Sequence, residues 1–418
     1  MAEQQYLKRN FSLSLLDGIT YFMGMIFISF ENVIPVYLVQ LGARPFWISL
    51  IPAIRNIAVF IPSIFIVRKI QGLNQQKGWI IKSGLFQRLP WLLSGLFCFF
   101  FASAHPRAAV FSIMLAIFLN NLGGGLSIPS FSYFTAKTIP VSLRGRLFAL
   151  RNLISYFFGI LCGGLITWLL TNIAFPRNYA VIILTGFGIL MIYLPAFLFQ
   201  VEPDARKTVD SSDESLKDFF IHLRDVLAGN RDLQNYIAGR VFYTLGFSAY
   251  TYFAVYLVDK FNLPGSSVGL FAILTAATFL LVNPVLGIVA DRMGHLFNHI
   301  AASLLLAAST GIAVFSDSYI VSLSIMVLGA AMMCIQNVSF FALPMEFGED
   351  HDIPLYSGLI GLFVGASSLL IVLFALLAEA YGYIPVFAVC FFLSFISLFF
   401  FKRTEDPRKR VAELLGDA

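Results

Sequence analysis

The stretch that decides the fold is AAVFSIMLAIFLNNLGGGLSIPSFSYF, residues 108–134, which contains no Asp, Glu, Lys or Arg. An α-helix rises about 1.5 Å per residue, so about 20 apolar residues cross the hydrocarbon core of a bilayer. This stretch is therefore predicted to be a transmembrane helix.

Similar stretches recur along all 418 residues of the chain. Hydrophobic residues make up 58% of the sequence and charged residues only 12%, with a mean hydropathy of +0.82. Soluble domains carry roughly 25% charged residues, so the composition excludes a soluble protein. We predict an all-α membrane protein of twelve spans, at 13–39, 46–67, 79–102, 108–134, 147–172, 178–201, 233–258, 265–289, 296–316, 319–344, 355–379 and 384–401.

Positive charge is distributed unequally between the two sides of this arrangement. The loops on the side opposite the N-terminus carry only Arg44, Arg107, Arg177 and Lys260, whereas the other side holds most of the remaining lysines and arginines. Because positive loops are retained in the cytoplasm, both termini are expected there. The predicted location is the cytoplasmic (inner) membrane, crossed many times.

The longest polar stretch, 202–232, divides the chain near its middle. We therefore predict a six-helix bundle over 1–201, a cytoplasmic linker with an amphipathic helix over 202–232, a second six-helix bundle over 233–401 and a tail over 402–418. The sequence Val-Tyr-Leu-Val closes both the first span, at 36–39, and the seventh, at 255–258. Two pseudo-symmetric bundles of this kind are typical of transporters whose substrate path lies between the halves.

The turn after the eighth span reads Gly287-Ile-Val-Ala-Asp291-Arg292-Met-Gly294-His295, and it resembles the signature loop of the major facilitator superfamily. The loop Ile139-Pro-Val-Ser-Leu-Arg144-Gly-Arg146 resembles a second loop that is common in that family. The resemblance implies that Asp291 and Arg292, with Arg144 and Arg146, form an inner gate. From the spacing we expect Gly287 to permit close helix approach and Gly294 a tight reversal.

The likeness is incomplete at three places. The equivalent loop of the first half, around Val67-Arg68-Lys69, lacks the glycine and the aspartate, so an asymmetric inner gate is expected. Asn120 stands four residues before Gly124, where proton-coupled drug exporters of the family often carry an arginine. The fifth span also lacks the glycine–proline pair of the antiporters, which weakens a drug-export interpretation.

Ionisable residues inside spans are candidates for function, because a charge at the centre of a bilayer costs about 2.5–3.5 kcal/mol on insertion scales. Glu31 and Arg55 are predicted at similar depth on the first two spans, where they form either a structural ion pair or a proton-coupling site. Arg240, followed by Tyr243 and Tyr250, lies in the seventh span. It either snorkels to the interface or faces the cavity, where it favours an anionic solute.

Uncharged polar residues complete the candidate site. In the family that the signature loop resembles, the first, fourth, seventh and tenth spans line the cavity. Those spans hold Asn32, Asn120, Asn121, Gln336 and Asn337 here. Their alternative role is hydrogen bonding between helices.

The function predicted from these features is secondary active transport of a small organic solute by alternating access, with the proton as coupling ion. Export is slightly favoured because the bundle is apolar and lacks the richly charged core expected for a strongly polar nutrient. The alternatives are uptake of an anionic or sugar-like solute, flipping of a lipid-linked substrate, and a non-transporting membrane scaffold. No catalytic motif, cofactor motif or metal-ligand spacing is found in the sequence, so an enzyme is not expected. We also expect a monomer that binds no nucleic acid.

Overall fold

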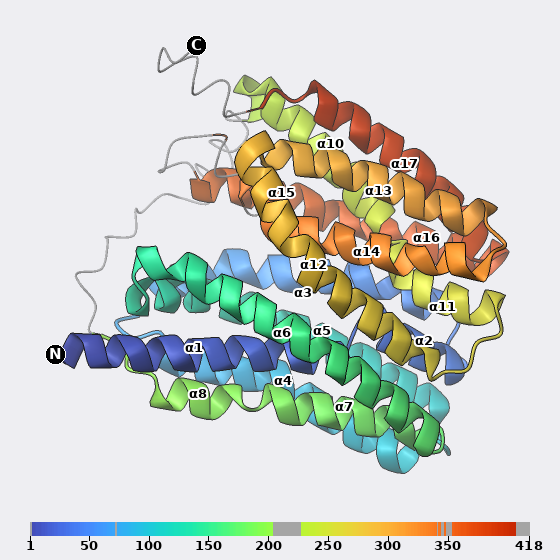
Figure 1. The fold of residues 1–418 in the computed structure, drawn as a ribbon, viewed down its shortest axis with the longest axis horizontal. Coiled ribbons are helices and arrows are strands. Elements are labelled where there is room, and N and C mark those ends of the chain that lie inside the picture. Colours follow the sequence, from blue (N-terminus) through green and yellow to red (C-terminus); the bar gives the residue numbers. More distant parts are fainter. Residues whose placement is uncertain are drawn as a thin grey trace. The chain divides into compact units, whose positions relative to one another are not determined.

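The computed structural model describes residues 2–71, 73–203, 227–340, 342–343, 347 and 353–406, and these residues form helices without any strand. Figure 1 shows long helices that run side by side within each part of the molecule. Ten of the described helical segments are long and apolar enough to cross a membrane. The predicted amphipathic helix of the linker lies outside the described residues.

Every predicted span corresponds to one helix or to one interrupted helix. In the first half these are α1 (Ala2–Phe27) with α2 (Val33–Gln40), α3 (Pro45–Gln71), α4 (Lys77–Phe101), α5 (Pro106–Thr138), α6 (Val141–Asn172), and α7 (Arg177–Leu190) with α8 (Tyr193–Phe199). In the second half they are α10 (Arg231–Phe247) with α11 (Tyr250–Lys260), α12 (Ser267–Met293), α13 (His295–Phe315), α14 (Tyr319–Ser339), α15 (Ile353–Ser367) with η2 (Ser368–Leu370) and α16 (Ile371–Tyr381), and α17 (Tyr383–Arg403).

The first and seventh spans are interrupted at related places, which agrees with the repeated Val-Tyr-Leu-Val. Between α1 and α2 the hydroxyl of Ser29 accepts from the backbone N–H groups of Glu31 and Asn32. Between α10 and α11 the hydroxyl of Ser248 donates to the carbonyl of Leu245. These hydroxyl bonds replace helical backbone bonds, which lets a helix break inside a membrane protein.

The chain divides into two compact units, Met1–Ser211 with Val258–Leu280, and Ser212–Leu257 with Leu281–Ala418. The predicted boundaries of the domains stay a prediction. In the first unit α4 packs against α5 and α7, and α1 packs against α6, α7 and α8. In the second unit α17 packs against α10, α13 and α16.

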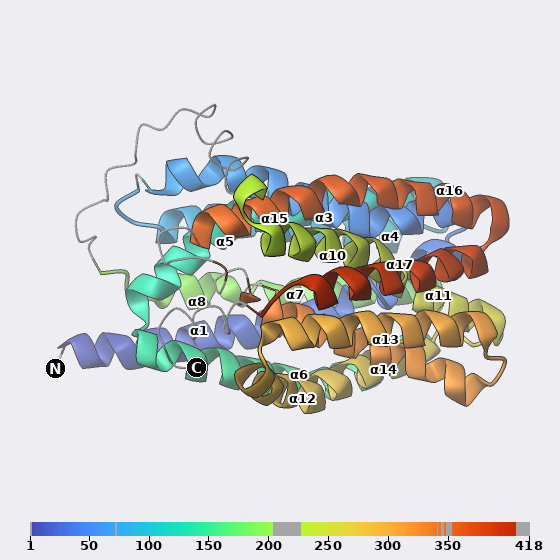
Figure 2. The same cartoon turned by 90° about the horizontal axis from the view of Figure 1, so that it is seen from above.

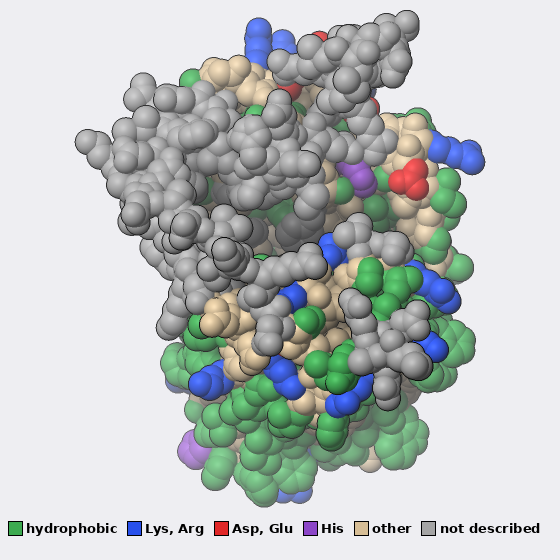
Figure 3. Space-filling view, turned by 90° about the vertical axis from the view of Figure 1, so that its left-hand side faces the viewer, with side chains coloured by type: hydrophobic (Ala, Val, Ile, Leu, Met, Phe, Trp, Pro, Cys, Tyr) green, Lys and Arg blue, Asp and Glu red, His purple; other side chains and the backbone are tan. Residues whose placement is uncertain are grey.

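We call the end of the first unit where α1 begins its proximal end, and the end where α2 and α6 finish its distal end. Figure 3 views the molecule from the side of the proximal end, where blue Lys and Arg side chains are scattered among the described residues. A buried group of Ile80, Phe134, Tyr193 and Phe197 forms the core near this end.

Glycines permit the closest helix contacts of the first unit. A Cβ atom on Gly123 of α5 would lie 2.7 Å from the Cα of Gln87 in α4. A Cβ on Gly269 of α12 would lie 2.6 Å from the carbonyl oxygen of Gly163 in α6. Figure 2 shows the same helices from above. The backbones of α6 and α12 thus meet at Gly163 and Gly269, and we call this contact the α6–α12 seam; a side chain at residue 269 would overlap the backbone of Gly163 and Thr167.

Candidate functional site

Three charged side chains gather inside the first unit, on three different helices. Asp17 lies on α1 with 5% of its surface exposed, and Arg88 lies on α4 with 6% exposed. Arg151 of α6 is partly buried, and both arginines act electrostatically on the Asp17 carboxylate. We call these three residues the Asp17 cluster.

Neighbouring residues hold the two arginines without neutralising them. Arg88 donates hydrogen bonds to the carbonyl oxygens of Leu190 and Gly84, both at 3.2 Å. Its guanidinium carbon lies 3.8 Å from the ring centroid of Tyr193, a favourable cation–π contact. Arg151 packs against Gly18, because any Cβ at that position would overlap its side chain.

The Asp17 cluster is electrically unbalanced. It contains one carboxylate and two guanidinium groups, and Oδ1 of Asp17 has no hydrogen-bond partner among the described residues. The Nε atom of Arg151 also lacks a partner in this part of the chain. Because buried polar groups without partners are costly, such atoms mark places where a proton, water or ligand is expected.

Glu31 and Arg55 lie in contact, as the sequence predicts. Nη1 of Arg55 is 2.5 Å from Oε1 of Glu31, and their side chains are 30% and 12% exposed for Arg55 and Glu31 respectively. The Arg55 guanidinium also stacks on Phe30, with its carbon 4.5 Å from the ring centroid. The contact satisfies both charges, and a coupling role for the pair stays a prediction.

Arg240 is the central charged group of the second unit. Only 2% of its surface is exposed, so it does not snorkel to an interface. Nη2 donates a 3.1 Å hydrogen bond to Oε1 of Gln336 on α14, and the guanidinium carbon lies 4.1 Å from the Phe340 ring centroid. No carboxylate forms an ion pair with Arg240 among the described residues.

Other polar atoms beside Arg240 are also without partners. Nε of Arg240, the Tyr243 hydroxyl and the Thr244 hydroxyl make no hydrogen bond within the described segments. The buried His299 is, by contrast, satisfied, because Nε2 lies 3.1 Å from the Tyr236 hydroxyl and Nδ1 lies 3.0 Å from the His295 carbonyl oxygen. Arg240, Tyr243, Thr244 and Gln336 are here called the Arg240 cluster.

The structure separates the remaining predicted polar residues from these clusters. Asn120 accepts a 3.0 Å bond from the indole of Trp91, and Asn121 donates back to the carbonyl of Ile117 at 2.8 Å. Asn337 is exposed, and Tyr250 packs against Gly329. Asn32 donates to the Thr275 hydroxyl at 3.3 Å, while its own side-chain oxygen has no partner among the described residues.

The predicted gate loops have mixed outcomes. Gly294 adopts a φ of +86°, which confirms the tight reversal between α12 and α13. The close approach expected at Gly287 is absent among the described residues, since a Cβ there would meet no atom within 4 Å. Asp291, Arg292 and Arg146 are exposed, and Arg144 caps α5 by donating to the carbonyls of Ile139 and Ala136.

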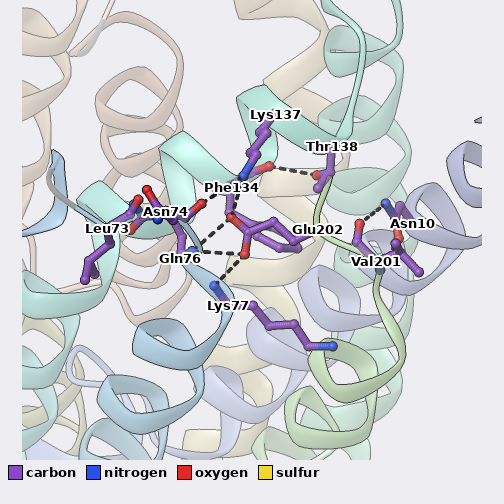
Figure 4. Close-up of polar contacts among 10 residues, drawn as sticks. All are labelled: Asn10, Leu73, Asn74, Gln76, Lys77, Phe134, Lys137, Thr138, Val201 and Glu202. Atoms are coloured by element: carbon purple, nitrogen blue, oxygen red, sulfur yellow. Dashed lines mark hydrogen bonds and ion pairs between the residues drawn. The ribbon is translucent and has the colours of Figure 1, made fainter. Parts of the chain in front are cut away.

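A carboxylate that the sequence analysis did not identify lies at the proximal end of the first unit. The Glu202 side chain accepts from the backbone N–H groups of Gln76 and Lys77, at 2.9 and 2.8 Å, and pairs with Lys137 at 3.1 Å (Figure 4). Asn10 binds the neighbouring Val201 backbone in both directions. Glu202 thereby caps the N-terminus of α4. This helix follows the loop around Val67-Arg68-Lys69, which lacks the aspartate that the second half carries at Asp291.

The Asp17 cluster was also missed by sequence reasoning. Asp17 stands near the start of the predicted first span, where a charged residue is expected to face the membrane interface. Arg151 lies near the cytoplasmic end of its span, where the positive-inside rule already accounts for an arginine. Only the packing of α1 against α6 shows that these side chains turn inward. The available signal was a carboxylate among apolar residues, Ser14-Leu-Leu-Asp17-Gly-Ile.

Comparison with known proteins agrees with this architecture. A family model described as Major Facilitator Superfamily matches residues 86–236 and 236–416. A mutant of the nucleoside transporter NupG has a similar structure with a TM-score of 0.71 and 11% sequence identity, covering 94% of this chain and 99% of that one. No curated protein sequence matches the chain.

The solved structures of two symporters are also similar to the structure of this chain. A D-xylose-proton symporter gives a TM-score of 0.72 at 12% identity, covering 96% of this chain and 99% of its own. The fucose:proton symporter FucP of E.coli gives 0.61 at 16% identity, with 94% and 98% covered. At these identities the likeness shows the fold alone. The matched family and structures are membrane transporters and not enzymes.

Proposed function

Because this chain belongs to the major facilitator superfamily of membrane transporters, we propose that it carries a small organic anion across the membrane, coupled to a proton. Arg240 is the observation that carries the proposal. This guanidinium is buried and has no carboxylate partner among the described residues, and the hydroxyls of Tyr243 and Thr244 on the same helix make no hydrogen bond within those residues either. Such a group attracts a carboxylate or phosphate, which accepts two parallel hydrogen bonds from it.

The first unit supports the same substrate class. With Asp17 ionised, the Asp17 cluster carries one net positive charge, and with Asp17 protonated it carries two. Uncompensated charges in a membrane interior are expensive, so an anionic solute that enters either cluster removes an energetic penalty. The buried cations also remove the reason for the export prediction, which was the apparent scarcity of charge in the bundle.

We propose Asp17 as the proton-binding group. A carboxylate that holds a proton cannot neutralise Arg88 and Arg151, so protonation makes the cluster more attractive to an anion. Proton and anion binding then favour one another. Glu31 is the alternative carrier, but its carboxylate is engaged by Arg55 at 2.5 Å.

The proposed direction is uptake. A membrane potential that is negative inside drives a monoanion outward with about 2.3 kcal/mol per 100 mV, so export of an anion needs no proton. Uptake with one proton cancels that charge. The proposal places both termini in the cytoplasm, which is supported by Lys77 and Lys137 at helix ends of the proximal end.

The experiment is transport into proteoliposomes that contain the purified full-length protein. Small organic acids are first screened by thermal shift, and each acid that stabilises the protein is then tested for accumulation with an inward proton gradient. We expect accumulation that a protonophore abolishes, with exchange of labelled for unlabelled acid persisting. A facilitator without coupling would show exchange only, and a scaffold would show neither. Stabilisation by lipid-linked compounds alone would favour a flippase.

A further inference from the structure

A cavity of about 410 Å³ opens at the distal end of the first unit. It forms where the end of α2, the connection from α6 to α7 and the turn before α12 meet, and it belongs to neither charged cluster. Its volume lies within the range of roughly 300–1,000 Å³ that is typical of small-ligand sites.

The lining of this distal cavity is polar but uncharged. None of the residues around it is acidic or basic, and the side chains that offer hydrogen bonds or a ring face are those of Gln40, Thr171, Phe175, Asn178, Tyr179 and Ser266. Amides and hydroxyls both donate and accept hydrogen bonds. A ligand that carries hydroxyl groups does the same, whereas a bare anion finds no countercharge here.

An aromatic wall borders the same cavity. The rings of Tyr37 and Tyr179 are stacked with their centroids 4.5 Å apart, and Phe175 meets Tyr179 edge-on at 6.3 Å. Tyr179 is fully buried, while 45% of the Phe175 surface is exposed. Phe175 therefore offers a supported ring against which the apolar C–H face of a sugar ring packs.

Local contacts fix the polar groups before any ligand arrives. Oδ1 of Asn178 accepts from the Tyr179 backbone N–H at 2.8 Å. A Cβ on Gly265 would lie 2.6 Å from Nε2 of Gln40, so the turn before α12 holds the Gln40 amide in place. Binding sites built on such fixed groups lose little entropy when a ligand binds.

We propose that the distal cavity is a capture subsite for an uncharged, hydroxyl-bearing ring, and that the transported anion carries such a ring, as a sugar acid does. The acid part of this substrate class rests on the proposed function. The cavity lies at the distal end of the α6–α12 seam. A solute bound there is therefore on the distal side of the contact between Gly163 and Gly269.

The test measures binding of three probes to the purified full-length protein: D-glucuronate, D-glucose and cyclohexanecarboxylate. We expect Gln40→Ala and Phe175→Ala to weaken D-glucuronate binding about tenfold and to leave cyclohexanecarboxylate binding unchanged. Both changes remove exposed side chains, so folding is expected to survive. Phe315→Ala, which truncates a phenyl ring that is 79% exposed in the second unit, is the matched control and should change nothing.

The outcomes separate the two proposals. If both variants bind D-glucuronate as the wild type does, the capture subsite is wrong and the anion proposal stands. If both variants weaken the two acids equally, the side chains act through the structure and the subsite is again wrong. If neither acid binds but D-glucose does, and the two variants lose it, the subsite is supported and the anion proposal fails.

Discussion

Nη2 of Arg240 donates a 3.1 Å hydrogen bond to Oε1 of Gln336, which joins α10 to α14 inside the second unit. A neutral acceptor thus orients the guanidinium without cancelling its charge. An acidic residue at the same place would cancel it. This relationship keeps Arg240 available for an anionic solute.

Gln336→Glu is predicted to abolish binding of organic acids, because the new carboxylate occupies Arg240 as an internal ligand. We expect at least a tenfold loss of affinity, together with an unchanged or higher thermal unfolding midpoint. The matched control is Asn337→Asp, which introduces the same charge at the next residue, where the side chain is exposed. Equal acid binding by Gln336→Glu and the wild type would show that Arg240 does not hold the solute.

Asp17→Asn is predicted to separate anion exchange from proton coupling. The amide cannot release a proton, so acid accumulation driven by a pH gradient should be lost while exchange of labelled for unlabelled acid continues. Asp317→Asn, at an exposed position, is the control. If Glu31→Gln rather than Asp17→Asn loses accumulation, the coupling group has been misassigned.

Glu202→Gln is predicted to destabilise the proximal end of the first unit. Its carboxylate satisfies two backbone N–H groups and Lys137, and hydrogen bonds of charged groups contribute about 1.5–3 kcal/mol each. We expect a lower thermal midpoint, measured in detergent. The control is Glu405→Gln, an exposed carboxylate that follows α17 as Glu202 follows α8. Equal midpoints for the two variants would exclude a capping role.

Gly269→Ala is predicted to open the α6–α12 seam. Its Cβ would lie 2.6 Å from the Gly163 oxygen and 2.7 Å from the Thr167 nitrogen, both backbone atoms that cannot rotate away. Gly164→Ala is the control, since a Cβ at Gly164 meets nothing within 4 Å among the described residues. We expect a cysteine introduced at Ser266 to react faster with a soluble maleimide in the Gly269→Ala background only. Identical labelling in both backgrounds would contradict the seam.

Trp91→Phe is predicted to lower stability without changing solute affinity. Loss of the indole N–H leaves the buried Asn120 oxygen without its donor, a penalty of about 1–3 kcal/mol. The measurements are the thermal midpoint and the acid affinity of the same preparation. Reduced affinity at an unchanged midpoint would instead place Asn120 in the solute site, as the sequence analysis expected.

Hydropathy was sufficient to predict the helical architecture, because a bilayer imposes long apolar stretches that a single sequence displays directly. The contact between Glu31 and Arg55 was also predictable, since a short loop places both residues at similar depth. Arg240 was recognised as a candidate, but its partner Gln336 was proposed only from span numbering.

The Asp17 cluster could not be predicted because the rotation of each helix about its axis is not encoded by hydropathy. A charge one turn from an interface has the same local sequence whether it faces water or the bundle. Asn120 illustrates the opposite error, since an amide in a predicted cavity helix is used to hold Trp91. Neighbouring helices decide both cases, and those contacts join residues far apart in the sequence.

The central claim is that a buried, uncompensated Arg240 binds the anionic group of the solute. The most direct measurement is calorimetric binding of a matched pair, cyclohexanecarboxylate and its uncharged primary amide, which carry no hydroxyl groups for the distal cavity, to the wild type and to Arg240→Gln, with the exposed-site variant Lys402→Gln as control. The account predicts that the wild type and Lys402→Gln bind the acid but not the amide, and that Arg240→Gln binds neither. Equal binding of acid and amide by the wild type, or acid binding that survives Arg240→Gln, would contradict it.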